Sequence, residues 1–148
     1  MEQGQVDEAI WSVVQDRFGF TDEELELFKN RHTNHKMLTT EAMTNIVNTN
    51  IVFEVIASRA CNTGHEVGQR IYFNAERGML AHKGPQYICP FLMPVMTRVM
   101  HIVQDRIWEG LDDPIPSVVR IGGCDDIGVE CGGVGRVLVQ VKIAREDA

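Results

Sequence analysis

The sequence predicts an α+β protein with a helical N-terminal arm at residues 1–50 and a body at residues 51–148. In the body, an antiparallel sheet of about four strands is expected to pack on one long helix. Two observations predict this class. Apolar residues recur at helical spacing in the arm and over residues 92–107, whereas β-branched residues dominate the runs on either side of that long helix.

The arm is expected to contain three helices. The first spans residues 6–17, and the second begins at a capping box formed by Thr21 and Glu24. Residues 31–36 are polar and are expected to form a loop, and a short helix follows over residues 39–47. Because the arm is short for an independent domain, we expect it to pack on the body or on a partner.

The body is expected to alternate between strands, loops and the long helix. Pro90 suits the start of that helix, and Pro94 indicates either that the regular helix begins near it or that the helix is kinked there. The segment between the second strand and the helix is expected to be a long loop or an irregular hairpin. Four runs have the composition of strands: residues 51–56, 67–73, 117–121 and 136–143.

Composition and charge limit the class of protein. The formal net charge is −7, which argues against nucleic-acid or anionic-membrane binding, because both need basic patches. No signal peptide and no apolar run of membrane-spanning length are visible, so we expect a cytoplasmic protein. In a reducing compartment the four cysteines are expected to be thiols or metal ligands rather than disulfides.

Five soft side chains are the candidate metal ligands. Each lies beside glycine, proline or a turn, and the spacing of the first two, Cys-x3-His, would let them share one ion. Three or four such ligands would suit zinc or an iron–sulfur cluster. The alternative is that the cysteines are small buried hydrophobic residues. The candidates are Cys61, His65, Cys89, Cys124 and Cys131.

A catalytic role is a second possibility for part of this set. Cys89 lies at the start of the long helix, whose dipole favours a thiolate, and Cys124 precedes Asp125 in a glycine-rich loop. Cys89 or Cys124 could act as a nucleophile or redox thiol with His65 as the base, and Asp125 could also serve as a base. For Asp126 we favour a turn-forming role between two strands.

The pattern Cys61-x-x-Gly64-His65-x-Val67-Gly68, followed by Cys89-Pro90 and by Cys124-Asp125, resembles a family of small uncharacterised prokaryotic proteins common in anaerobes. The resemblance covers residues 51–144. It implies that Cys61, His65, Cys89 and Cys124 act as a set. The chain departs from the family pattern at Gln69, where the family has aspartate, and at Cys124-Asp125-Asp126, where the family has Cys-Pro-Asp.

Three hypotheses about function follow. The first is a cytoplasmic metal- or cluster-binding accessory protein or subunit of a larger enzyme system. The second is an enzyme with a cysteine and histidine site. The third is a ligand-binding or oligomerisation module with inert cysteines. A homo-oligomer or a protein partner is expected to bind through the long helix or the N-terminal arm.

Overall fold

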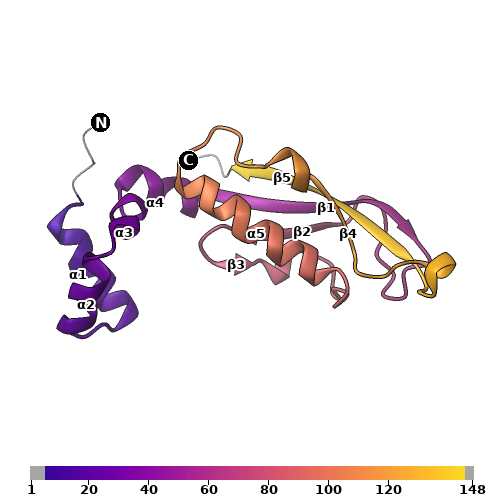
Figure 1. Ribbon diagram of the computed structural model, residues 1–148, viewed down its shortest axis with the longest axis horizontal. Helices are drawn as coiled ribbons and strands as arrows, with labels where there is room; N and C mark the ends of the chain where they lie inside the picture. Colours follow the sequence, from indigo (N-terminus) through magenta and orange to yellow (C-terminus); the bar gives the residue numbers. More distant parts are fainter. Residues whose placement is uncertain (1–5, 146–148) are drawn as a thin grey trace.

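A computed structural model describes residues 6–145 of the chain, apart from the side chain of residue 32 (Figure 1). Residues 1–5 of the predicted arm and residues 146–148 of the tail lie outside the described residues. The α+β class is confirmed. The arm holds α1 (Glu8–Phe18), α2 (Asp22–Lys29), α3 (His32–Met37) and α4 (Thr40–Val47). The body holds β1 (Thr49–Arg59), β2 (Arg70–Asn74), β3 (Gly78–Met79), α5 (Met93–Trp108), β4 (Ile121–Gly123) and β5 (Arg136–Arg145).

The prediction of a loop at residues 31–36 is wrong, because this segment forms α3. Two of its polar side chains bond to backbone carbonyls at the end of α2. The Asn34 side-chain amide donates to the Phe28 carbonyl at 2.7 Å, and His35 Nε2 lies 2.6 Å from the Lys29 carbonyl oxygen. The His35 bond satisfies a carbonyl that the end of a helix leaves without an intrahelical partner, and the Asn34 bond adds to the one that the Phe28 carbonyl accepts from the Arg31 N–H. A polar segment is thereby stabilised as a helical turn.

The arm has a small hydrophobic cluster of its own. Trp11 and Leu25 are buried in it, and the Trp11 ring meets the Phe28 ring edge to face at 6.4 Å. Helix α4 contacts both parts of the chain, since its Met43 packs against this cluster and its Ile46 lies in the core of the body. The arm therefore joins the body through α4, and α1 and α2 lie at one end of the molecule (Figure 1).

The five strands form one antiparallel sheet in the order β3-β2-β1-β5-β4. The central strand β1 pairs with β5 from Thr49 opposite Arg145 to Arg59 opposite Arg136, with a register shift between Val55 and Ala57. Its β-branched and aromatic residues suit this buried position. The irregular hairpin expected after the second strand contains the short strand β3, which makes the sheet five-stranded rather than about four-stranded.

The prediction of a strand at residues 117–121 is wrong for most of these residues. Ser117–Val119 forms a 3₁₀ turn, and only Ile121–Gly123 pairs with β5 as β4. Val118 is 89% exposed, so its β-branched side chain gains nothing from a sheet position. The run lies at the sheet edge directly after Pro116, where few strand neighbours are present to override the turn.

Helix α5 lies along one face of the sheet (Figure 1). It begins at Met93 with Pro94 in its first turn, which is the position where proline costs least, so no kink is needed. Its apolar stripe packs against the inward residues of β1, β2 and β5 to form the core. Met96, Val103 and Leu92, just before the helix, are fully buried there. No helix within residues 6–145 combines the length and the apolar character needed to cross a membrane.

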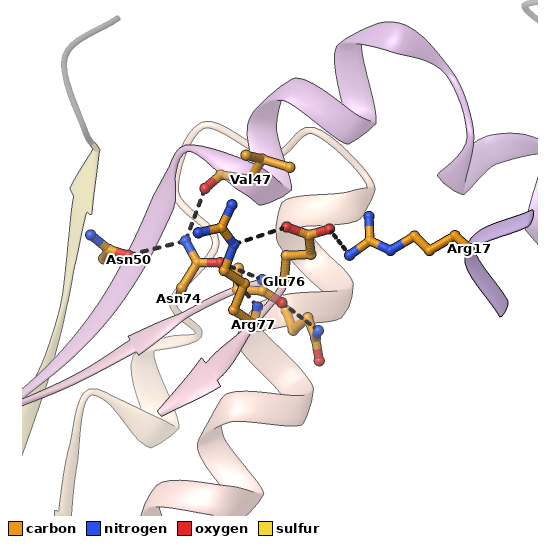
Figure 2. A network of polar contacts seen from close by, with 8 residues as sticks. Arg17, Val47, Asn50, Asn74, Glu76 and Arg77 are labelled. Atoms are coloured by element: carbon orange, nitrogen blue, oxygen red, sulfur yellow. Dashed lines mark hydrogen bonds and ion pairs between the residues drawn. The ribbon is translucent and has the colours of Figure 1, made fainter. Parts of the chain in front are cut away.

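A polar network fastens the arm to the body at the β2–β3 turn (Figure 2). The Asn74 side chain donates to the Val47 carbonyl at 2.9 Å and to Asn50 Oδ1 at 3.2 Å, and it accepts from the backbone N–H groups of Glu76 and Arg77. Glu76 then pairs with Arg17 of α1 at 2.6 Å. One buried asparagine thus ties α4, β1 and the turn together, and one carboxylate reaches the arm.

Candidate functional site

Three connections converge on a pocket of about 550 Å³ beside the start of α5. They are the β1–β2 loop, the segment that leads into α5, and the β4–β5 loop, which lies at the end of the molecule opposite α1 and α2 (Figure 1). Each connection brings one cysteine to the pocket. The lining residues are Cys61, Asn62, Thr63, Cys89, Pro90, Phe91, Leu92, Cys124, Asp125, Asp126, Ile127 and residues 133–137.

Cys61 is placed by a tight turn at the end of β1. Ala60 adopts a positive φ of 48°, and the Gly64 N–H donates to the Cys61 carbonyl at 3.1 Å. Gly64 itself has a φ of 80°, a conformation that glycine adopts without steric cost. The turn leaves the Cys61 side chain partly buried at the wall of the pocket.

His65 lies in the same loop but does not line the pocket. It is 3% exposed, and both ring nitrogens are hydrogen-bonded. Nε2 accepts from the Cys89 backbone N–H at 3.1 Å, and Nδ1 lies 3.0 Å from the side-chain oxygen of Gln69. His65 therefore connects the β1–β2 loop to the segment that carries Cys89.

Cys89 begins the turn that leads into α5. Its carbonyl accepts from the Leu92 N–H at 2.9 Å and from the Met93 N–H at 3.2 Å, so the backbone curls directly into the helix. The same segment meets the third wall, because the Phe91 carbonyl accepts from the Asp125 N–H at 2.8 Å. Phe91 is 56% exposed and forms part of the rim.

Cys124 continues from β4 and remains paired with β5. Its N–H donates to the Val137 carbonyl at 2.9 Å, and its sulfur accepts from the Val137 N–H at 3.3 Å. Asp125 follows with an exposed side chain at the pocket. The sheet edge therefore fixes the backbone of Cys124 and directs the next residue toward the opening.

Asp126 organises the rest of the β4–β5 loop. Its carboxylate accepts from three backbone N–H groups at 2.9–3.0 Å, those of Gly128, Val134 and Gly135. These bonds, the one from Gly135 first, hold the pKa of the Asp126 carboxyl below its usual value. The Asp126 side chain therefore stabilises the turn between β4 and β5, as its position between two predicted strands indicates.

Cys131 lies apart from the other three cysteines. It ends the 3₁₀ turn Val129–Cys131, is exposed, and does not line the pocket. Of the five predicted ligands, the structure thus brings Cys61, Cys89 and Cys124 to one cavity, with Asp125 beside them. His65 and Cys131 do not line this cavity.

Nowhere in the described part of the chain do three His, Cys, Asp or Glu side chains lie close enough together to hold a metal ion. The donor set at the pocket, three thiols and one carboxylate from separate walls, is chemically suited to a thiophilic group but is too dispersed for a single tetrahedral ion. Single-ion zinc binding at these positions finds no support in this arrangement.

Sequence reasoning missed Gln69 and Phe91 as parts of the site. Gln69 stood out only as a departure from the family pattern, although its spacing from His65, four residues, allows two side chains of one loop to meet. Phe91 carried no signal beyond its place after Cys89-Pro90. Only the folded chain shows that its carbonyl joins two walls of the pocket.

Comparison of the chain with protein-family models, with curated proteins and with solved structures finds no match in any of the three. The resemblance to the prokaryotic family therefore stays a prediction. The geometry of the pocket is the observation on which a functional proposal can be built.

Proposed function

We propose that this protein binds a thiophilic ligand in the three-thiol pocket and acts as an accessory protein or subunit of a larger enzyme system. An iron–sulfur cluster or another soft metal group larger than a single ion is the first candidate. Thiolates are the ligands that such groups prefer, and Cys61, Cys89 and Cys124 would hold it. When bound, it would supply electron transfer or Lewis acidity.

The observation that carries the proposal is the convergence of Cys61, Cys89 and Cys124 on one cavity from three separate connections. Their sequence separations, 28 and 35 residues, give no local reason for them to meet. All three are partly buried, which shields a bound group while leaving an opening to solvent. The volume of the pocket is large enough for a ligand of several heavy atoms.

Anaerobic reconstitution of the reduced protein with iron and sulfide tests the proposal. We expect visible charge-transfer absorption and bound iron in the unaltered protein, and a loss of at least tenfold in bound iron in C61S, C89S and C124S. The matched control is C131S, which makes the same sulfur-to-oxygen replacement at a cysteine outside the pocket. It is expected to retain the cluster. Absence of bound metal after reconstitution, or equal loss in C131S, would contradict the proposal.

A second candidate is an apolar-ligand-binding protein in which the thiols only pack. Phe91, Ile127 and Val134 line the pocket and are each more than half exposed, so their burial by an apolar ligand would be favourable. This candidate predicts that a fluorescent hydrophobic probe binds equally well to C89S and to the unaltered protein. Loss of probe binding in C89S would exclude it.

The enzyme hypothesis draws less support from the geometry. A general base needs a free acceptor within reach of the proton that it takes. The two nitrogens of His65 are engaged by Cys89 N–H and Gln69, so His65 is not placed to activate a thiol. Asp125 remains the one predicted base at the pocket.

A further inference from the structure

We propose that His65 is a positioning residue of the three-thiol pocket: as a neutral ring with its proton on Nδ1, it fixes the Cys89 backbone. It supplies neither a ligand nor a base. This inference rests on the proposed function in one respect: it takes the three-thiol pocket to be the functional site. The hydrogen bonds of His65 alone assign the role.

The hydrogen bonds select one tautomer. A backbone N–H can only donate, so the Cys89 N–H at 3.1 Å requires an unprotonated lone pair on His65 Nε2. The proton of a neutral ring must then reside on Nδ1. There the side-chain oxygen of Gln69, at 3.0 Å, accepts it. Both contacts are satisfied together in this tautomer and in no other protonation state.

Burial makes the arrangement costly to abandon. His65 is 3% exposed, and its backbone carbonyl is also engaged, since the Ser58 hydroxyl donates to it. If Nε2 turned to bind a ligand, the Cys89 N–H would lose its acceptor inside the protein. An unpaired buried donor is more costly than the net gain from a typical hydrogen bond. The ring therefore acts as a fixed support.

This support links all three walls of the pocket. The Gln69 side chain bonds to Nδ1 of the His65 ring, and Nε2 of that ring accepts from the Cys89 N–H. Two residues later, the Phe91 carbonyl accepts from the Asp125 N–H. Cys89 and Cys124 are thus kept in register by a continuous path of backbone and side-chain bonds. Removal of the acceptor at His65 should loosen Cys89 first, because that bond is the one lost.

Nitrogen NMR of the metal-free, reduced protein tests the tautomer directly. We expect the His65 ring to show a directly bonded proton at Nδ1 and a bare Nε2 near neutral pH. A proton on Nε2 in the folded protein would overturn the inference, because the Cys89 N–H would then have no acceptor.

Thiol labelling tests the positioning role. We expect H65L to raise the labelling rate of Cys89 relative to Cys131 about tenfold, the order expected when one buried hydrogen bond is lost. H65Q is the matched rescue, since its side-chain oxygen can accept from the Cys89 N–H, and its ratio should stay within about twofold of the unaltered protein. Equal ratios in all three proteins, or equal rises in H65L and H65Q, would overturn the inference.

A further variant keeps the test decisive if H65L does not fold. In Q69L the ring remains and Nε2 still accepts from the Cys89 N–H, but Nδ1–H loses its acceptor, so the proton should stay on Nδ1 while the ring is held less firmly and Cys89 labelling rises. An unchanged labelling ratio, or a proton on Nε2, would contradict the proposal. None of these measurements uses metal, so a failed cluster reconstitution and a failed positioning role are distinguishable.

Discussion

The two ends of the molecule use buried and partly buried polar side chains in opposite ways. At the arm end, Asn74 and Glu76 bond to groups of the arm and of the β2–β3 turn and close the junction between them (Figure 2). At the pocket end, His65 and Asp126 bond to loop backbones and hold those loops around a cavity. Similar bonding can thus either fasten two elements to each other or hold cysteine-bearing loops around a cavity.

The largest expected effect lies at the pocket end, at Gly135. A side-chain carbon there would fall inside contact distance of the Arg59 and Ala60 carbonyl oxygens, so the loop would have to move away from β1. We expect Gly135→Ala to lower the free energy of unfolding by about 3 kcal/mol. Urea denaturation measures this loss.

Gly84→Ala is the control for this substitution, because its added carbon would meet only ordinary contacts at 3.7 Å or more. It should change the unfolding free energy by less than about 1 kcal/mol. If the two variants were equally stable, the close approach of the β4–β5 loop to β1 would be disproved.

The next effect breaks the arm end. Asn74→Ala removes the donor to Val47 and the acceptor for the turn N–H groups while the partners remain buried or partly buried. We expect a loss of about 2 kcal/mol in the free energy of unfolding. Thermal or urea denaturation provides the measurement.

The exposed Asn62, replaced by alanine, is the control for Asn74→Ala and should leave stability almost unchanged. Cys89 labelling should also be unaffected in Asn74→Ala, because the network lies at the other end of the molecule. An increase in labelling as large as that in H65L would mean that the two ends do not act separately.

Asp126→Asn sharpens the comparison through its pH dependence. The pKa of Asp126 is lowered in the folded state by N–H donors, so the ionised carboxylate favours folding. This contribution is fully present above the unfolded-state pKa near 3.8 and is lost as pH falls through the lower, folded-state value. We expect the variant to melt at a lower temperature than the unaltered protein at pH 7, with the gap narrowing below about pH 4.

Asp125→Asn, one residue earlier, is the natural control because the Asp125 carboxylate is exposed. Its melting temperature should follow that of the unaltered protein across the same pH range. A gap between Asp126→Asn and the unaltered protein that widened toward low pH would show that the sign of the argument is wrong.

The smallest effect is expected at the arm ion pair. The Arg17 side chain is 56% exposed, so solvent screens its interaction with Glu76. We expect Arg17→Ala to reduce the unfolding free energy by about 0.5 kcal/mol, roughly a quarter of the Asn74 effect. A loss as large as that of Asn74→Ala, measured in the same urea series, would show that the ion pair fastens the arm as strongly as the asparagine does.

Much of the secondary structure follows from local signals. The capping box at Thr21 and Glu24 forms as expected, and β1, β5 and α5 lie where their β-branched runs and apolar stripe predict. The misplaced elements are those in which context decides. α3 is polar but is stabilised by carbonyls of α2, and the run at residues 117–121 is β-branched but lies at an edge with few partners.

The sequence by itself determined the α+β class, the order of the main elements, and the separate settings of Cys61, Cys89 and Cys124, because period, caps and turn residues act over a few positions. Only the tertiary structure decided that these three cysteines line one cavity, that Cys131 does not, and that His65 bonds to the segment that carries Cys89. Such proximity depends on strand order and loop path, which bring residues dozens of positions apart into contact.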